Sequence, residues 1–206
     1  MTLIRNIFFT SDLHFGHKNI IKFCDRPWAS VPEMDEGLIE NWNKTVGAED
    51  LIYILGDLFF CSSTRAKEII KRLNGHKILI LGNHDWKRIK ENKADEYGLF
   101  TICNFRTIEI GERTVYMHHF PYRGFGDHVE GEERYSEHRL VNEGHWLLHG
   151  HIHTGWKIKE KCINVGVDVW NYFPVSLEQI TTLIQETEMH PLHTSPNIDR
   201  IAMVKD

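Results

Sequence analysis

The sequence has few cysteines and no long hydrophobic run, and both absences narrow what the chain can be. Its four cysteines (Cys24, Cys61, Cys103 and Cys162) lie far apart and form no C-x-x-C pair, so a disulfide framework is not indicated. No stretch reaches the roughly 18 apolar residues that a membrane-spanning helix needs, and the first residues lack the pattern of a secretory signal. We therefore expect a reduced, cytoplasmic protein that is not associated with a membrane.

An excess of positive charge is also missing. The chain has 24 Lys+Arg against 29 Asp+Glu, a formal net charge of −5, so no overall basic field attracts nucleic acid or an anionic membrane. There is no internal repeat and no low-complexity tract, and 206 residues fit one core of ordinary size. We expect one domain over residues 1–187 and a loosely attached C-terminal tail over residues 188–206.

Histidine is abundant, with 14 residues, and many of them follow short apolar runs. Five runs, each typical of a buried strand, end in His, Asp or Asn: 7–9 before Asp12 and His14, 51–55 before Asp57, 79–81 before Asn83, 115–117 before His118 and His119, and 146–148 before His149, His151 and His153. Open α/β sheets bind their ligands at the carboxyl ends of such strands. The chemistry of this protein is therefore expected where these runs end.

The first half of the chain alternates strands and helices. A capping box of Ser30 and Glu33 opens a helix with Met34, Leu38 and Trp42 on one face. A second helix is predicted over residues 64–73, with Ser63 as its N-cap. The resulting strand–helix order implies parallel strands with right-handed crossovers.

After about residue 100 the pattern changes to a meander of short strands. We predict strands at 101–105, 106–110 and 114–117, with a turn at Gly111 and Glu112, further strands near 146–148 and 162–167, and a helix over 177–187 opened by Ser176 and Gln179. The polar insert 122–139 is too long for a simple connection. The fold class predicted is α/β: a four-layer α-β-β-α sandwich, two mixed sheets face to face with helices outside.

The residues at the strand ends form a mixed oxygen and nitrogen set. It consists of Asp12, His14, Asp57, Asn83, His119, His151 and His153. This set is too large for one tetrahedral zinc and suits two divalent cations. A carboxylate can bridge such a pair, and Asp57 is the natural candidate for that role. Because two metals activate a water and neutralise phosphate oxygens, the reaction class indicated is phosphoester hydrolysis.

These motifs resemble those of the calcineurin-like metallophosphoesterase superfamily. The shared blocks are Asp12-Leu13-His14, Gly56-Asp57, Gly82-Asn83-His84-Asp85, His119-Phe120-Pro121 and Gly150-His151-Ile152-His153. The resemblance implies that Asp12, His14 and His153 hold one metal, that Asn83, His119 and His151 hold the other, and that Asp57 bridges them. It implies two divalent ions (manganese, iron, zinc or nickel, with manganese favoured) and attack by a metal-bridging hydroxide. Finer similarities at 17–21, Arg26-Pro27 and 166–170 resemble small stand-alone bacterial and phage phosphoesterases.

Residues around this set are assigned further roles. The resemblance implies that His84 contacts the substrate phosphate and acts as general acid, oriented by Asp85. Asn83 is also expected at the substrate, and Arg26 is a candidate because a guanidinium can grip a phosphate through two hydrogen bonds. Ordinary structural roles are favoured for the remaining residues, with His118 and His149 packed or supporting the ligands, Trp170, Tyr172 and Asp168 in the core, and Arg123, Arg134 and Arg139 in a solvated mixed-charge loop.

The function predicted is a metal-dependent phosphoesterase that hydrolyses a phosphodiester or phosphomonoester. A small phosphorylated substrate, nucleotide-type or other, is preferred because no basic stripe is visible for a polymer, and sequence-specific binding of nucleic acid is not expected. One alternative is a metal-dependent nuclease, with the insert 122–139 guiding a strand. Another is a non-catalytic metal-binding scaffold, which the intact set of motif residues disfavours.

Overall fold

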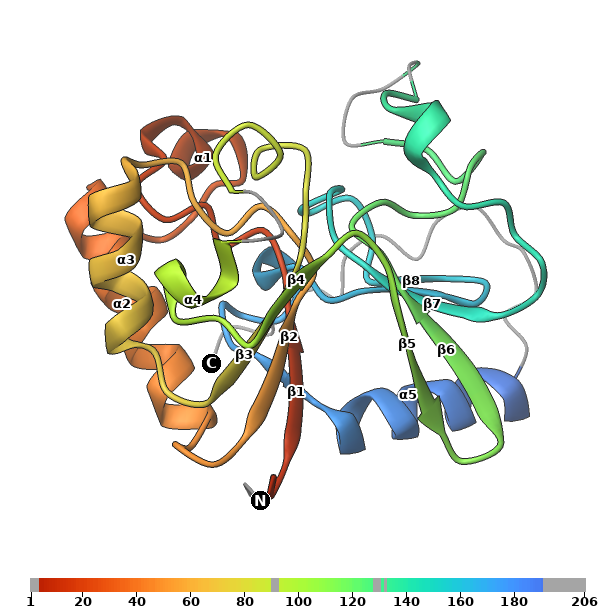
Figure 1. The fold of residues 1–206 in the computed structure, drawn as a ribbon. Coiled ribbons are helices and arrows are strands. Elements are labelled where there is room, and N and C mark those ends of the chain that lie inside the picture. Colours follow the sequence, from red (N-terminus) through yellow and green to blue (C-terminus); the bar gives the residue numbers. More distant parts are fainter. Residues whose placement is uncertain (1–3, 90–92, 128–130, 132, 191–206) are drawn as a thin grey trace, which may run out of the picture.

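A computed structural model describes residues 4–89, 93–127, 131 and 133–190, and within them the chain forms two five-stranded sheets (Figure 1). The first sheet has the order β10-β1-β2-β3-β4, with β1 (Ile7–Thr10), β2 (Leu51–Ile54), β3 (His76–Ile80), β4 (Thr101–Cys103) and β10 (Val175–Ser176). The second has the order β5-β6-β7-β9-β8, with β5 (Arg106–Ile110), β6 (Arg113–Met117), β7 (Trp146–His149), β8 (Ile158–Lys159) and β9 (Cys162–Asn164).

Both sheets are mixed, as predicted. Strands β1 to β4 run parallel and β10 pairs antiparallel with β1. In the second sheet β6, β7 and β9 are parallel, and β5 and β8 are antiparallel edge strands. One placement was wrong: β4 pairs with β3 in the first sheet and is no part of a meander. The chain therefore passes between the sheets after Cys103, and the hairpin at Gly111 and Glu112 lies wholly in the second sheet.

The α-helices are α1 (Lys18–Phe23), α2 (Val31–Thr45), α3 (Ser63–Arg72), α4 (Ala94–Tyr97) and α5 (Leu177–Met189), and short 3-10 turns are η2 (Ser136–His138) and η3 (Val167–Val169). The capping box of Ser176 and Gln179 is confirmed. At α2 the Ser30 hydroxyl accepts from the backbone N–H of Glu33, but the Glu33 carboxylate accepts from the Ser30 hydroxyl and from the backbone N–H of Ala29 instead of the backbone N–H of Ser30. The N-cap of α3 is Ser62, one residue before the predicted Ser63.

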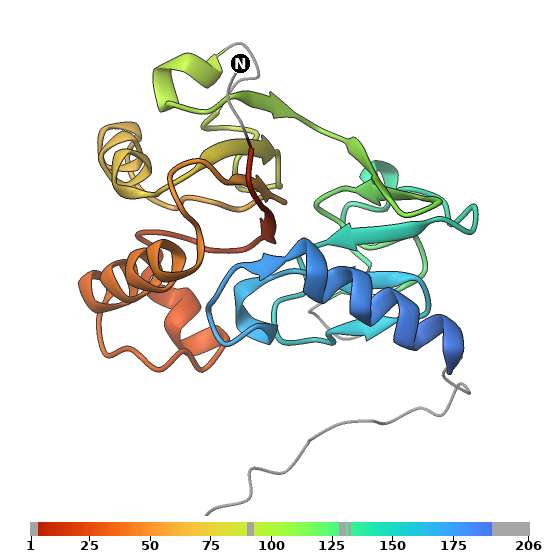
Figure 2. The same cartoon turned by 90° about the horizontal axis from the view of Figure 1, so that it is seen from below.

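The buried apolar residues form two large cores, one between the first sheet and its helices and one between the two sheets. Apolar residues of α2, α3 and the loops after the strands pack on the outer face of the first sheet. A second cluster fills the space between the sheets, from Phe9 and Leu55 on one side to Val115 and Leu148 on the other. In Figure 2, α2 and α3 lie on one side of the molecule and α5 on the other. Ile180 and Ile184 of α5 join the core between the sheets.

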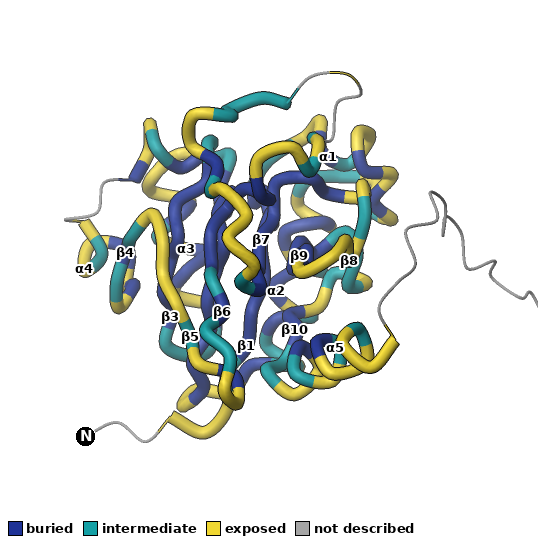
Figure 3. The backbone as a smooth tube through the Cα atoms, turned by 90° about the vertical axis from the view of Figure 1, so that its right-hand side faces the viewer, coloured by how far each residue is buried: buried dark blue, intermediate teal, exposed yellow. Residues whose placement is uncertain are grey.

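The outer face of the second sheet is covered by a loop. Tyr122, Phe125 and Leu140, at the two ends of the insert 122–139 and just beyond it, pack with Leu147 and Cys162. In Figure 3 the strand β7 is buried, whereas β5 and much of α5 are exposed. Helix α5 extends to Met189, two residues beyond its predicted end. Most of the predicted C-terminal tail, residues 191–206, lies outside the described residues. No helix in the described part of the chain is long and apolar enough to cross a membrane.

Candidate metal centre

The loops that follow β1, β2 and β3 meet those that follow β6 and β7 at one end of the sandwich. The backbone N–H of Asp12 donates to the carbonyl of Gly56, and that of His14 donates to the carbonyl of Asp57, each at 3.0 Å. The second sheet is joined at the same end, because Val167 N–H donates to the Ser11 carbonyl at 3.1 Å. Parallel strands thus deliver residues distant in sequence to one place.

Much of the backbone at this place is left-handed. Five of the seven predicted metal ligands have positive φ: Asp12 (56°), His14 (53°), Asp57 (54°), His151 (72°) and His153 (49°). This conformation is uncommon outside glycine, costs on the order of 1–3 kcal/mol per residue, and clusters at functional sites. The backbone strain is therefore concentrated where the predicted ligands lie.

Glycine is required at the positions just before several ligands because the loops approach one another closely there. A Cβ on Gly56, whose φ is +93°, would lie 2.7 Å from the Cα of Gly82 and would also meet His119. A Cβ on Gly82 would lie 2.6 Å from the backbone N of Asp57, and one on Gly150 would meet the side chains of Ser11 and Asp12. The Gly-Asp, Gly-Asn and Gly-His pairs therefore allow the ligand-bearing loops to pack directly on one another.

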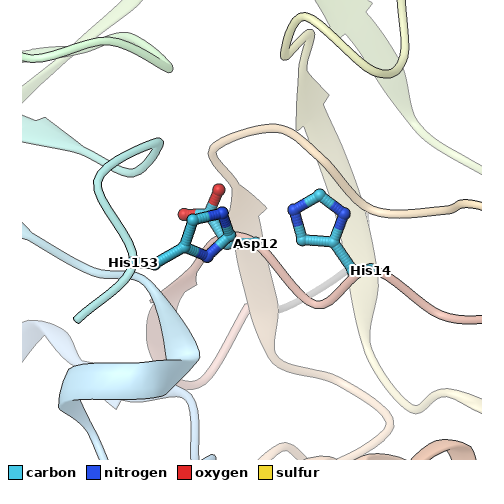
Figure 4. A group of neighbouring side chains, drawn as sticks. All are labelled: Asp12, His14 and His153. Atoms are coloured by element: carbon cyan, nitrogen blue, oxygen red, sulfur yellow. The ribbon is translucent and has the colours of Figure 1, made fainter. Parts of the chain in front are cut away.

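Asp12, His14 and His153 form the first group (Figure 4), and their ligand atoms all lie within 4.8 Å of one another. The Asp12 carboxylate accepts from the backbone N–H of His151 at 2.9 Å. Both ring nitrogens of His14 are buried without a hydrogen-bond partner among the described residues. A buried imidazole with neither nitrogen satisfied is costly, and a cation would supply the partner of the nitrogen that carries the lone pair.

Asn83, His119 and His151 form the second group. The Oδ1 atom of Asn83 lies 3.0 Å from Nε2 of His119 and 3.1 Å from Nδ1 of His151. Nδ1 of His119 lies 2.8 Å from the carbonyl of Leu55, which can only accept, so this nitrogen carries the proton and Nε2 presents a lone pair. Acceptor atoms therefore converge on Asn83, as a metal site requires.

Asp57 lies between the two groups. Its Oδ2 is 3.6 Å from Nε2 of His14 in the first group and 3.6 Å from Nε2 of His119 in the second. Its Oδ1 accepts from the backbone N–H of His84 at 2.9 Å. Asp12, Asp57 and His119 also form a set with ligand atoms within 4.8 Å, so the two groups share one continuous cluster of donors.

The electrostatics of the cluster suit cations. Burial raises the pKa of Asp12 to about 6 and the pKa of Asp57 well above its ordinary value. Burial also lowers the pKa of His14 and His119 well below the ordinary value. Neutral imidazole is the form that binds metals, and a bound cation offsets the cost of burying charged carboxylates. The residues present therefore fit divalent metal ions.

Asp85 organises the loops and does not contact the ring of His84 in any hydrogen bond of the described residues. Its carboxylate accepts from the backbone N–H of Asp57 at 2.7 Å, Leu58 at 3.2 Å and Gly82 at 2.9 Å. The predicted orientation of His84 by Asp85 is thus replaced by support of the Asp57 loop. The His84 side chain is 38% exposed, with Nε2 at 3.9 Å from Asp57 Oδ2, so it borders the cluster and reaches solvent.

Arg26 lies beneath the site and is buried. Its Nε donates to Asp168 at 2.8 Å, Nη1 to the Leu13 carbonyl at 2.9 Å and Nη2 to the Asp12 carbonyl at 2.7 Å. A guanidinium engaged in this way has little left for a substrate phosphate. The structure therefore gives Arg26 a supporting position in place of the predicted substrate contact. The sequence did not indicate this position because the ion-pair partner, Asp168, is 142 residues away.

The insert 122–139 was predicted to be a solvated loop, which is wrong for Arg139. The buried position of Asp127 in the same insert was not predicted. Arg139 is 3% exposed, and its Nη2 donates to Asp127 at 2.7 Å. Nε2 of His151 also lies 3.1 Å from the Asp127 carboxylate. A weak signal was present, because Gly126-Asp127 repeats the Gly-acid pairing of Gly56-Asp57; no apolar strand precedes it, so the pattern did not stand out.

Other residues predicted to have structural roles are packed in the folded chain. His118 packs on Phe120, and buried His149 packs on Trp156. Trp170 joins the core between the sheets, and Tyr172 packs against the core outside the first sheet. Cys24, His153 and Asp168 form a third set with ligand atoms within 4.8 Å, but both oxygens of Asp168 are engaged by Arg26.

The fold and the buried Asp and His clusters define the class of protein. The profile of the calcineurin-like phosphoesterase family matches residues 5–155, and the chain belongs to this family. The match contains all the strand-end motifs, and the two sheets have the architecture of the metallophosphoesterase sandwich. The buried Asp and His groups could hold metal ions.

Among individual proteins, the relatives are small. The chain is 36% identical over 192 residues to an uncharacterized protein of Methanocaldococcus jannaschii, covering 89% of this chain and 93% of the relative. It is 35% identical over 202 residues to the Gene 66 protein of Mycobacterium phage D29, covering 89% and 98%. A solved structure, a protein of unknown function from Aquifex aeolicus, is similar with a TM-score of 0.65 and 27% identity, covering 86% of this chain and 98% of that chain.

Proposed function

We propose that the protein is a di-metal phosphoesterase that hydrolyses a phosphodiester or phosphomonoester of a small, nucleotide-type or other, substrate. The observation that carries this proposal is the position of Asp57, whose Oδ2 lies 3.6 Å from Nε2 of both His14 and His119. A single carboxylate between two groups of donors suits a bridge between ions about 3.5–4 Å apart. Membership of the phosphoesterase family supports the reaction class.

The two groups define which residues would hold the ions. Asp12, His14 and His153 would hold one, Asn83, His119 and His151 the other, and Asp57 would contact both. When bound, the ions would neutralise phosphate oxygens and lower the pKa of water, which is the chemistry of two-metal hydrolases. The mixed oxygen and nitrogen set suits manganese, iron, zinc or nickel, and manganese is the ion to test first.

His84 would donate the proton to the leaving group. Its backbone N–H is held by Asp57 at 2.9 Å, while its ring stands at the exposed edge of the cluster. Burial, with smaller contributions from His17 and Arg88, lowers the pKa of His84 to about 4, so the ring is neutral at pH 7 before substrate binds. An anionic phosphate beside the ring raises its pKa. The ring would thus take up its proton together with the substrate.

The charges near the site favour a small substrate over a polymer. In the described part of the insert, Arg139 is buried on Asp127, Arg134 lies 3.5 Å from the same carboxylate, and Arg123 donates to the Ser136 carbonyl. These cations are directed at their own loop, which leaves little positive surface to hold a polyanionic strand. The net charge of −5 agrees with this choice.

The test is hydrolysis of bis-p-nitrophenyl phosphate, p-nitrophenyl phosphate and single-stranded DNA, each with Mn²⁺, Fe²⁺, Zn²⁺ or Ni²⁺. The variant is Asp57→Asn, which is isosteric and lacks the bridging charge. The matched control is Asp50→Asn, a buried aspartate that accepts from Asn6 and Gly47 and belongs to neither donor group. We expect metal-dependent turnover of an aryl phosphate that Asp57→Asn abolishes and Asp50→Asn preserves.

Two results would change the assignment. Turnover confined to DNA would favour a nuclease. Metal binding without turnover of any of the three substrates would favour a non-catalytic scaffold.

A further inference from the structure

The histidines of the loop after β7 each face an aspartate with one ring nitrogen. Nε2 of His151 lies 3.1 Å from Oδ2 of Asp127, and Nδ1 of His153 lies 3.1 Å from Oδ2 of Asp168. The two contacts use opposite nitrogens of the ring. Neither aspartate belongs to the two groups of donors described above, and they come from separate parts of the chain, the insert and η3.

Each of these aspartates is held by a buried arginine. Arg139 Nη2 donates to Asp127 at 2.7 Å, and Arg26 donates to Asp168 through Nε at 2.8 Å and Nη2 at 3.0 Å. The four side chains have 0% exposure. An arginine partner keeps a buried carboxylate charged, and its planar fork fixes the orientation of the oxygens.

The arginines also tie the pairs to the backbone. Arg26 donates to the carbonyls of Asp12 and Leu13, in the loop that carries the first group. Arg139 donates to the carbonyls of Gly126 and Arg134 in the insert. The carboxylates therefore stand at positions that the surrounding chain determines.

An ionised carboxylate only accepts hydrogen bonds, so the ring nitrogen facing it carries the proton. For His151 the proton is then on Nε2, and Nδ1 presents its lone pair to Asn83 Oδ1 at 3.1 Å. For His153 the proton is on Nδ1, so Nε2 carries the lone pair with which this ring can join Asp12 and His14. Two histidines separated by one residue are thereby held in opposite tautomers.

We propose that the Asp127–Arg139 and Asp168–Arg26 pairs are positioning devices that set the ring tautomers of His151 and His153, and that each supports the binding of one of two metal ions. The insert 122–139 contributes to the site in this way, through Asp127, and Arg26 acts through Asp168. Partners of this kind orient ligating imidazoles and raise their basicity. The proposal rests on the metal-binding part of the proposed function.

The first experiment reads the tautomers directly. In protein labelled with ¹⁵N-histidine, two-bond ¹H–¹⁵N correlation spectra distinguish protonation at Nδ1 from protonation at Nε2. Burial lowers the pKa of His153, but the hydrogen bond to Asp168, with smaller contributions from Cys24 and Asp12, raises this pKa well above its ordinary value, so the spectra are recorded at a pH at which both rings are neutral. We expect His151 protonated at Nε2 and His153 at Nδ1 in the metal-free protein, with assignments from His151→Gln and His153→Gln. The reverse tautomer at both rings would overturn the proposal.

The second experiment measures metal affinity by competition with a chelator, using Mn²⁺ and Zn²⁺ alone. In Asp127→Asn we expect one of the two ions to bind about 10–100-fold more weakly and the other to be nearly unchanged. Asp168→Asn should weaken the other ion by a similar factor. Asp50→Asn is the control, because Asp50 is a buried aspartate that contacts none of the histidines of the two groups. Equal affinities in all four proteins would overturn the proposal.

A single substitution leaves an arginine buried without its partner, so folding is checked by circular dichroism. Where Asp127→Asn does not fold, the double variant Asp127→Asn with Arg139→Met removes both charges and carries the same expectation. Wild-type protein that binds no metal would refute the proposed function, and the tautomer spectra would still decide the hydrogen-bond arrangement. Wild-type protein that binds two ions, with both variants unaffected, would refute only the positioning role.

Discussion

Replacing Gly82 by alanine tests how tightly the ligand-bearing loops are packed. A Cβ at this position would meet Oδ1 of Asp57, would lie 2.6 Å from the Asp57 backbone N, and would lie 2.9 Å from Cε1 of His119. Gly82 does not have a left-handed φ, so alanine is not strained by the backbone itself. The effect of the substitution is steric and is directed at the residue that lies between the two donor groups.

The size of the effect follows from these distances. Ordinary contact begins near 3.4 Å, so the approach of 2.6 Å to a backbone atom has to open by about 0.8 Å. Metal–ligand distances tolerate changes of about 0.2 Å, and a misplacement of about 1 Å costs on the order of 10²-fold in rate. Overpacking destabilises the fold by about 1–3 kcal/mol. The substitution should therefore impair metal binding much more than it lowers the free energy of unfolding.

The assay is metal content by mass spectrometry after dialysis against Mn²⁺, with thermal unfolding measured on the same samples. Gly47→Ala is the matched control, since its Cβ would approach only the Asp50 carboxylate, at 3.2 Å from Oδ2. We expect Gly82→Ala to fold and to lose at least one ion, and Gly47→Ala to keep both. Full metal content and wild-type turnover in Gly82→Ala would refute the steric argument.

Three further predictions concern catalysis, metal removal and pH. His84→Ala should retain both ions and lose at least about 10²-fold in turnover, the usual scale for a general acid; unchanged turnover would remove His84 from the mechanism. Chelation should lower the melting temperature, because an ion at 100 times its Kd stabilises the fold by about 2.7 kcal/mol; identical melting curves with and without chelator would contradict metal binding. Burial lowers the pKa of Lys77 from 10.5 to about 8. Between about pH 8 and pH 10.5 Lys77 is more protonated in the unfolded chain than in the folded one. The contribution of Lys77 to the free energy of unfolding therefore rises with pH over this range. The free energy of unfolding of the wild type should therefore increase relative to Lys77→Met from pH 8 to pH 10, by on the order of 1–3 kcal/mol. A constant difference in urea unfolding across this range would contradict it.

Much of the donor cluster was predictable because it depends on local patterns. An apolar run followed by Gly and a polar residue marks a buried strand that ends in a site. Parallel strands bring their carboxyl ends to one edge, so Asp12, Asp57 and Asn83 had to be neighbours once β1, β2 and β3 were predicted. The strands were less certain where they were short, which is why β4 was placed with the wrong partners.

The amino-acid sequence by itself determined the strand-end motifs, the glycines that let the loops approach, and the family to which the chain belongs. Only the tertiary structure decided the support around them. The roles of Arg26 and Asp127 depend on partners 142 and 24 residues away, and the pattern of neighbouring residues cannot show whether a charged side chain is solvated or buried. The left-handed backbone at Asp12 and His151 likewise has no local signal. Such conformations and buried charges are stable only when packing from distant segments compensates them, and that compensation exists only in the folded chain.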